Sequence, residues 1–216
     1  MFNLTVLIWC LLNFSTSVEN RKTQEATPDS LSILYKECSL DGLVDFSIFQ
    51  KSVAGIQHYQ PTKRIVTIVD FSLPSDRKRF FVIDLDQKKL LLSTWVAHGK
   101  KSGLRMAEHF SNVLESHQSS SGFYRVGKPI QSPKHGSALL LFGLEKGIND
   151  NAERREIILH GAAYVSEDFV KKNGRCGRSF GCPALPLELM PKIVPMLSNG
   201  SLLYIHTEQK KQRTNA

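Results

Sequence analysis

The chain has 216 residues, of which 41% are hydrophobic and 9% aromatic, and this suits one compact domain with a buried core. Lys and Arg total 28 against 20 Asp and Glu, a formal net charge of +8 that favours an anionic partner. The sequence has no RNP-like aromatic pattern, no zinc-type spacing of Cys and His and no recognisable helix-turn-helix, so we expect no nucleic-acid partner and no metal. A solvated basic surface is the simpler interpretation of the charge.

The N-terminus combines a short apolar run with small residues. The run over residues 4–12 is too short to span a bilayer, and Ser15 and Ser17 follow it at a spacing that signal peptidase accepts. This pattern predicts a signal peptide over residues 1–17 and an exported chain with a flexible lead-in over residues 18–28. The usual positive residues before the run are missing, so a buried N-terminal strand or helix remains the alternative.

Export changes how the cysteines are interpreted. The mature chain would keep Cys38, Cys176 and Cys182, and with an odd number at least one thiol has no partner within the chain. An unpaired thiol retained in an oxidising compartment is usually buried or reactive. Burial on an apolar helical stripe explains Cys38, whereas Cys176 and Cys182 lie in a loop rich in Gly and Arg and need another explanation.

Residues 29–60 are predicted to form a small helical appendage. Two apolar stripes recur there at helical spacing, with Asp29 and Ser30 as capping candidates for the first and Asp45 for the second. The stripes consist of Leu31, Leu34, Tyr35 and Cys38, and of Phe46, Phe49, Val53 and Ile56.

From Lys63 onward the apolar period changes to two, which predicts short strands in a mainly β domain over residues 61–206. The strand-like segments are residues 64–72, 79–85, 89–98, 137–144, 155–161 and 201–206, the second and third joined by a hairpin that turns at Asp86-Gln87. Long loops are expected over residues 99–125 and 161–185, one helix over 187–197, and a disordered basic tail over 207–216. Several strands with few helices predict a β-sandwich or half-open barrel.

His160 and Cys182 are the candidates for chemistry. His160 ends a strand pattern, and a loop can fold Cys182 back to it, so the imidazole could take the thiol proton and the thiolate attack a carbonyl. Arg175 and Arg178 lie close in sequence and could lower the pKa of the thiol. A tight turn at Gly181 could bring successive backbone N–H groups, those of Phe180, Gly181 and Cys182, onto an oxyanion. From these residues alone, a buried histidine with a Cys176–Cys182 disulfide stays an alternative.

Residues 160–186, "HGAAYVSEDFVKKNGRCGRSFGCPALP", resemble the active-site segment of the L,D-transpeptidase catalytic-domain family (YkuD-like), in the branch with Gly-Arg-Ser-aromatic-Gly-Cys-Pro. The likeness runs collinearly from residue 31 to residue 206. Further matches are "VAHGKKSG" (96–103), "SSSGFY" (119–124), "LFGLEKGINDNAERR" (141–155) and "SNGSLLYIH" (198–206).

The resemblance implies a β-sandwich-like catalytic domain that acts on peptidoglycan tetrapeptide stems. By resemblance, Cys182 is the nucleophile, His160 is the general base, and the carbonyl of Gly161 orients the imidazole. The thiolate would attack the carbonyl of the third stem residue, typically diaminopimelate, and release the terminal D-alanine. Transfer to a second stem would give a 3→3 crosslink, and transfer to water would make the protein a carboxypeptidase. The resemblance implies neither a metal nor an organic cofactor.

The nucleophile segment departs from the larger family. Phe180 stands where a second histidine is usual, and no arginine follows Cys182, so we expect Arg178 to supply the positive charge. The residues assigned to substrate or oxyanion contacts are Arg178, Ser179, Phe180, Gly181 and Tyr124. Tyr124 is either a substrate contact or a core aromatic, and Cys176 is either a passive small residue or the partner of Cys182 in a regulatory disulfide.

The function expected from the resemblance is that of an exported, monomeric transpeptidase of the periplasm or cell envelope. A non-catalytic wall-binding module that kept the fold is the alternative from a different class. A cysteine peptidase or a sortase-like enzyme could also use His160 and Cys182, although Arg213 in the tail is a poor candidate for the arginine that sortases need.

Overall fold

The computed structural model describes residues 28–208. The predicted signal peptide and almost all of the predicted lead-in and tail therefore lie outside the described residues. Within residues 28–208, no helix combines the length and the apolar character needed to cross a membrane.

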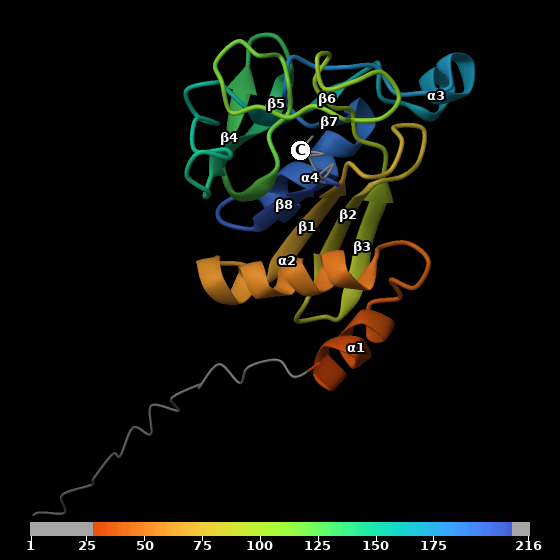
Figure 1. Ribbon diagram of the computed structural model, residues 1–216, viewed down its shortest axis with the longest axis vertical. Helices are drawn as coiled ribbons and strands as arrows, with labels where there is room; N and C mark the ends of the chain where they lie inside the picture. Colours follow the sequence, from red (N-terminus) through yellow and green to blue (C-terminus); the bar gives the residue numbers. More distant parts are fainter. Residues whose placement is uncertain (1–27, 209–216) are drawn as a thin grey trace, which may run out of the picture.

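Eight strands form a single sheet in the order β3-β2-β1-β8-β4-β5-β6-β7 (Figure 1). Neighbouring strands are antiparallel, apart from the parallel pairs β1–β8 and β6–β7. The strands are β1 (Ile65–Asp70), β2 (Phe80–Asp84), β3 (Lys89–Thr94), β4 (Gly122–Ser132), β5 (Gly136–Gly143), β6 (Ile158–Ala162), β7 (Ala184–Pro186) and β8 (Leu202–His206).

The two edges of this sheet approach each other. Ala97, just after β3, donates its N–H to the carbonyl of Ala184 in β7 at 2.8 Å, and the two residues form an isolated antiparallel bridge. This contact joins the β3 edge to the β7 edge and leaves a half-open barrel. The mainly β fold class expected from the sequence is confirmed.

The sheet is buried on both faces where β1, β2 and β8 meet. Side chains alternate along a strand, so Val66 and Ile68 of β1 pack toward α1 (Pro28–Glu37) and α2 (Phe46–Tyr59), while Val69 packs into the other core cluster. Gly55 lets α2 lie close to the sheet, because a Cβ there would collide with the Phe123 ring. Figure 1 shows α2 lying across these strands.

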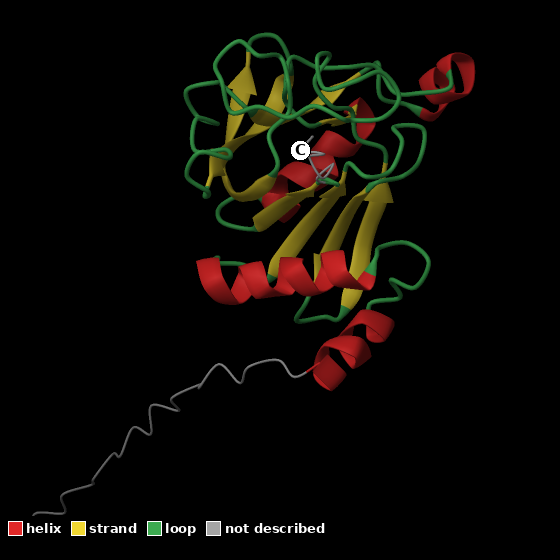
Figure 2. Cartoon of the chain, in the orientation of Figure 1, coloured by secondary structure: helices red, strands yellow, loops and turns green. Residues whose placement is uncertain are grey.

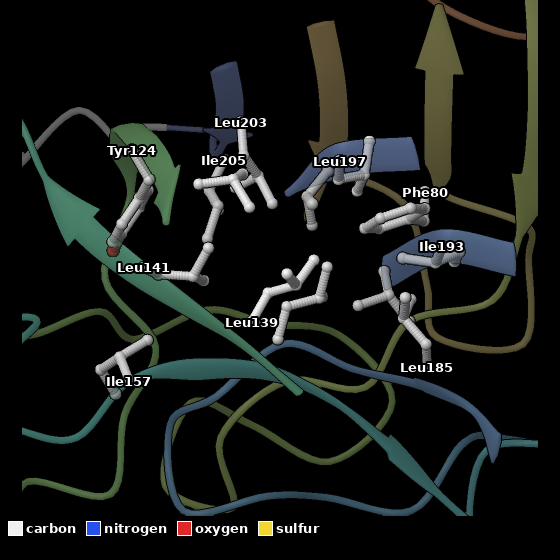
Figure 3. Packing of buried hydrophobic residues seen from close by; sticks show 14 of the residues in the cluster. Phe80, Tyr124, Leu139, Leu141, Ile157, Leu185, Ile193, Leu197, Leu203 and Ile205 are labelled. Carbon is white, nitrogen blue, oxygen red and sulfur yellow. The ribbon is translucent and has the colours of Figure 1, made fainter. Parts of the chain in front are cut away.

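The second core cluster fills the barrel around α4 (Met190–Leu197). Ile193 and Leu197 of this helix meet Leu139 of β5 and Leu203 of β8, all completely buried (Figure 3). The sequence predicted one helix over residues 187–197, whereas the structure has a 3₁₀ turn at Leu187–Leu189 before α4. Apolar burial in this cluster fixes the sheet that carries the candidate site.

Three elements differ from the sequence-based expectation. The predicted loop over residues 99–125 ends early, because β4 begins at Gly122, and the predicted loop over 161–185 contains α3 (Glu167–Asn173) as well as β7. β4 escaped detection because Gly127 and Pro129 interrupt its alternation, and the β4–β5 pairing indeed shifts register between Val126 and Pro129.

The β2–β3 hairpin is confirmed. Asp84 pairs with Lys89, and the Asp84 carboxylate accepts the backbone N–H groups of Asp86 and Gln87, both at 2.9 Å. Figure 2 shows the long loops gathered around β4 to β7, on the side of the molecule away from α1 and α2. That loop-rich end carries the candidate site.

Candidate active site

The candidate nucleophile lies beside the strand that carries the candidate base. β7 lies beside β6 (Figure 1). It runs parallel to β6 with Ala184 opposite His160, and Cys182 lies two residues before Ala184. Because the strands are parallel, this register sets Cys182 beside Ile158, two residues before His160. The backbone N–H of Ile158 accordingly donates to the Cys182 Sγ at 3.5 Å.

The Cys182 thiol is partly exposed and its polar contacts are with the backbone. Besides the N–H of Ile158, Sγ lies 3.7 Å from the carbonyl oxygen of Glu156, which can accept the thiol proton. Within residues 28–208, no hydrogen bond joins Sγ to the His160 imidazole. Packing raises the pKa of the thiol, while the N–H of Ile158 and the guanidinium of Arg155 oppose this shift.

His160 is buried, with 1% of its surface exposed. Its Nδ1 lies 2.9 Å from the carbonyl oxygen of Gly161, and Nδ1 donates when it carries the ring proton, which leaves Nε2 as the basic nitrogen. Burial lowers the pKa of His160 to about 4, and the positive charges of His135 and Lys134 act in the same direction. The imidazole is therefore neutral at pH 7, the state in which it can accept a proton.

A second imidazole, from His135, covers that of His160. Their ring centroids are 3.8 Å apart with an interplanar angle of 31°, and His135 lies in the turn between β4 and β5. The sequence alone assigns His135 no role. No sequence signal marks it, because the pairing of β5 with β6 brings the turn to His160.

Ser179 and Gly181 shape the turn that presents Cys182. The buried Ser179 hydroxyl donates to the Cys182 carbonyl at 2.6 Å and accepts the Gly181 N–H at 3.1 Å, so that N–H is engaged within the loop. Gly181 has φ +130°, which a side chain rarely adopts, and a Cβ there would lie 2.9 Å from the carbonyl oxygen of Gln118. Ser119 holds the turn from outside by donating to the Gly181 carbonyl at 3.0 Å.

Phe180 projects from this turn and is 55% exposed. The Lys100 Nζ lies 4.1 Å and the Lys134 Nζ 5.2 Å from its ring centroid, and the His117 ring meets it edge-on at 4.8 Å. Phe180 also lines an open pocket of about 330 Å³ together with Leu114, Glu115, His117, Arg154, Arg155 and Glu156. The pocket adjoins the thiol, because the carbonyl of Glu156 faces Sγ.

The cation whose charge lowers the pKa of the Cys182 thiol is Arg155, which the sequence did not single out. Arg178, expected to supply the charge, donates to the carbonyls of Lys100 and Gly103 at 3.0 and 3.2 Å. The charge of Arg155 instead lowers the pKa of the Cys182 thiol. Its Nη2 lies 3.3 Å from the position that a Cβ on Gly181 would occupy. Four hydrogen bonds fix its guanidinium, to Ser111 O, Ser120 Oγ, Gln118 O and Ser116 Oγ.

Tyr124 belongs to the core. Its side chain is fully buried and its hydroxyl donates to the carbonyl of Ser120 at 3.1 Å, so it has no surface for a substrate to contact in this structure. Through this hydrogen bond Tyr124 supports the loop that Arg155 also binds at Ser120. Of the two roles that the sequence left open, the core aromatic is the one observed.

A buried cation braces the loops on the other side of the site. Arg79 is completely buried and donates to the carbonyls of Val96 and Leu73, at 2.7 to 3.1 Å, and to Nδ1 of His98 at 2.8 Å. His98 contacts the Gly103 carbonyl at 3.3 Å through Nε2, and its own carbonyl accepts the N–H of Ser179 at 3.0 Å. His98 is thus a structural residue.

Cys176 is buried beside this cation, and its thiol donates to the carbonyl of Ser75 at 2.9 Å. Burial raises the pKa of Cys176 to about 11, and the thiol is free in this structure. Within residues 28–208, no group of three His, Cys, Asp or Glu side chains has the geometry of a metal site.

A mainly β half-open barrel that presents a partly exposed cysteine on a glycine turn beside a buried neutral histidine has the parts of a cysteine acyl-transfer enzyme. The model of the L,D-transpeptidase catalytic domain family matches residues 41–206 of this sequence. The chain belongs to that family.

The solved structures that resemble this chain are distant from it in sequence. The enzyme from Mycobacterium smegmatis is 13% identical, with 67% of this chain and 59% of that chain covered at a TM-score of 0.42. The helical cell shape determining protein Pgp2 from Campylobacter jejuni is 12% identical, with 69% of this chain and 50% of that chain covered at a TM-score of 0.43. The L,D-transpeptidase from Stackebrandtia nassauensis is 14% identical, with 84% of this chain and 78% of that chain covered at a TM-score of 0.39. The chain thus spans between half and three fifths of the length of the first two. No curated protein is significantly similar to it.

Proposed function

We propose that the protein is an exported cysteine transpeptidase that cleaves the third-to-fourth residue bond of peptidoglycan stem peptides and forms 3→3 crosslinks. The observation that carries the proposal is the placement of the partly exposed Cys182 thiol beside β6, the strand that holds the buried, neutral His160. Family membership supports chemistry on peptidoglycan.

Acylation begins with transfer of the Cys182 thiol proton to Nε2 of His160. The thiolate attacks the carbonyl carbon of the third stem residue, and the C–N bond to the terminal D-alanine breaks as the imidazolium protonates the leaving amine. The product is a thioester on Cys182 and free D-alanine. In the second half, the side-chain amine of another stem attacks the thioester, passes its proton to His160, and releases the thiol.

The raised pKa of Cys182 makes His160 necessary in this scheme. A thiol with a pKa above its ordinary value is almost fully protonated at pH 7, so few molecules carry a thiolate without a base. In the structure the thiol proton faces the Glu156 carbonyl, so its transfer to Nε2 requires rotation of the Cys182 side chain about Cα–Cβ. The bond of Nδ1 to Gly161 keeps Nε2 free for the proton.

The surroundings of the thiol support a peptide with carboxylates as the substrate. Phe180, Lys100 and Lys134 offer an apolar surface flanked by two ammonium groups, and the whole chain carries a net charge of +8. A basic surface favours binding to a carboxylate-rich polymer, and this binding weakens as the salt concentration rises. Export to the periplasm or cell envelope and a monomeric state belong to this proposal.

Incubation with purified disaccharide-tetrapeptide and mass analysis of the products tests the proposal. A joined tripeptide–tetrapeptide supports it, and loss of one alanine alone identifies a carboxypeptidase instead. Binding without any covalent change would identify a wall-binding module. Cys182→Ala is the negative control, and Cys176→Ala is the matched control that removes a thiol outside the site.

A further inference from the structure

The turn between β4 and β5 reaches into the candidate site with two adjacent side chains. Lys134 extends its Nζ over the ring of Phe180, at 5.2 Å from the centroid, and His135 lays its ring over that of His160, at 3.8 Å between centroids. One turn thus contacts both the loop of the nucleophile and the ring of the base. The backbone holds it there, because β5 pairs with β6 through Ala138 opposite His160.

The His135 ring gives the buried His160 ring a second contact that fixes its orientation. Its hydrogen bond from Nδ1 to Gly161 fixes one edge but still permits the ring to tilt about that bond. A flat ring against its face removes this freedom and excludes water from that side. His135 is itself anchored, since its backbone N–H donates to the Ser132 hydroxyl at 3.3 Å.

We propose that His135 is a positioning residue for the reaction, which holds and shields the imidazole of the base His160 through ring-on-ring contact. The inference rests on the proposed function, because it assigns His135 a task only if His160 acts as a base. His135 acts through His160 and transfers no proton itself.

This role predicts a specific pH behaviour. The groups whose charges act on His160 are His135 and Lys134 from the turn, while the Cys182 thiol lies on the neighbouring loop. Burial and both charges keep the pKa of His160 at about 4. Removal of the His135 ring exposes the imidazole and deletes one of the charges, so both effects raise the pKa of His160. The base is then lost to protonation at a higher pH.

The experiment compares the rate of Cys182 acylation by a carbapenem, followed by intact-mass spectrometry between pH 4 and pH 8, in wild type, H135A and H135F. For a rise of two pKa units in H135A, its acylation at pH 5 should be about tenfold slower than wild type, with a smaller deficit at pH 8. H135F keeps a ring over His160 and should retain most of the wild-type profile. His58→Ala, an exposed histidine on α2, serves as the control and should leave the profile unchanged.

Three results would overturn the inference. One is an H135A profile that superimposes on wild type. Another is an H135F profile shifted as far as that of H135A, which would mean that the ring contact is irrelevant. A defect that is equal at every pH and accompanied by lower thermal stability would also count against it, as a loss of structure. Failure of the proposed function looks different, because wild-type protein would then form no adduct on Cys182 at any pH.

Discussion

The backbone N–H of Ile158 points at the sulfur of Cys182, 3.5 Å away, so the strand that carries the candidate base also contacts the candidate nucleophile. His160 lies two positions after Ile158, and β7 begins at Ala184, two positions after Cys182, alongside them. The base therefore lies on β6, and the nucleophile lies in the turn that leads directly into the parallel strand β7. Changes to either residue should alter the chemistry more than the fold.

Cys182→Ala should abolish formation of a covalent adduct with a carbapenem while the midpoint of thermal unfolding moves by only a few degrees. The thiol is partly exposed and its polar contacts are long, so its removal costs about 1 kcal/mol or less. Intact-mass spectrometry and thermal denaturation of the same sample check both halves. An adduct that persists in the variant would place the reactive thiol at Cys38 or Cys176.

His160→Gln should change the form of the pH dependence as well as the rate. Wild-type acylation should stay high down to a pH near the His160 pKa of about 4. Without the base, only the spontaneous thiolate reacts, and since burial raises the pKa of Cys182, the rate should rise about tenfold per pH unit from pH 6 to 8. Equal rates in the two proteins at pH 7 would show that another group takes the proton.

Acid should destabilise the folded protein because two buried histidines resist protonation. Burial lowers the pKa of His98 to about 3 and of His160 to about 4, both below the ordinary value near 6.5 of the unfolded chain. The stability that they contribute is complete above pH 6.5 and is lost as pH falls toward the folded values. For His160 the loss amounts to about 3 kcal/mol by pH 4. Urea denaturation between pH 4 and pH 8 measures it, and a stability independent of pH would contradict the burial.

Arg79→Met should strongly destabilise the folded protein, although Arg79 takes no direct part in the reaction. The substitution leaves the carbonyls of Leu73 and Val96 and the Nδ1 of His98 without their donor in a buried place, at a cost of about 3 kcal/mol or more. Arg105, which is exposed and paired with Asp76, provides the matched control. Arg105→Met should change the urea midpoint far less, and equal shifts in the two variants would contradict the bracing role of Arg79.

The sequence was informative about the fold where a strand forms a short segment rich in apolar residues. β1, β2 and β8 are such segments, and the Asp86-Gln87 turn is capped by the nearby carboxylate of Asp84, so their positions follow from local physics. β4 was missed because the bulge at Gly127 and Pro129 is stabilised by its partner strand and not by its own sequence. Period and propensity report only local preferences, whereas pairing decides an irregular strand.

The candidate site was predictable only in part for a similar reason. His160, Gly161 and Cys182 lie in one recognisable segment, and the structure sets the first two on β6 and Cys182 in the turn just before the adjacent strand β7. His135 and Arg155 come from other parts of the chain, and their contacts depend on sheet register and on the path of the loop over residues 111–120. Nearness in sequence pointed to Arg178 instead, which binds the loop at Lys100 and Gly103.

Arg155→Gln should raise the pKa of the Cys182 thiol further and slow its alkylation by iodoacetamide. The guanidinium stabilises the thiolate by its charge, and glutamine keeps some of the hydrogen bonds to the surrounding loop but not the charge. A rise of one pKa unit makes alkylation about tenfold slower at a fixed pH below the pKa. The pH dependence of alkylation gives the pKa directly, and Arg178→Gln is the matched control. If Arg178→Gln produces the larger shift, the assignment of the cation to Arg155 is wrong, and the charge must act through the nucleophile loop itself.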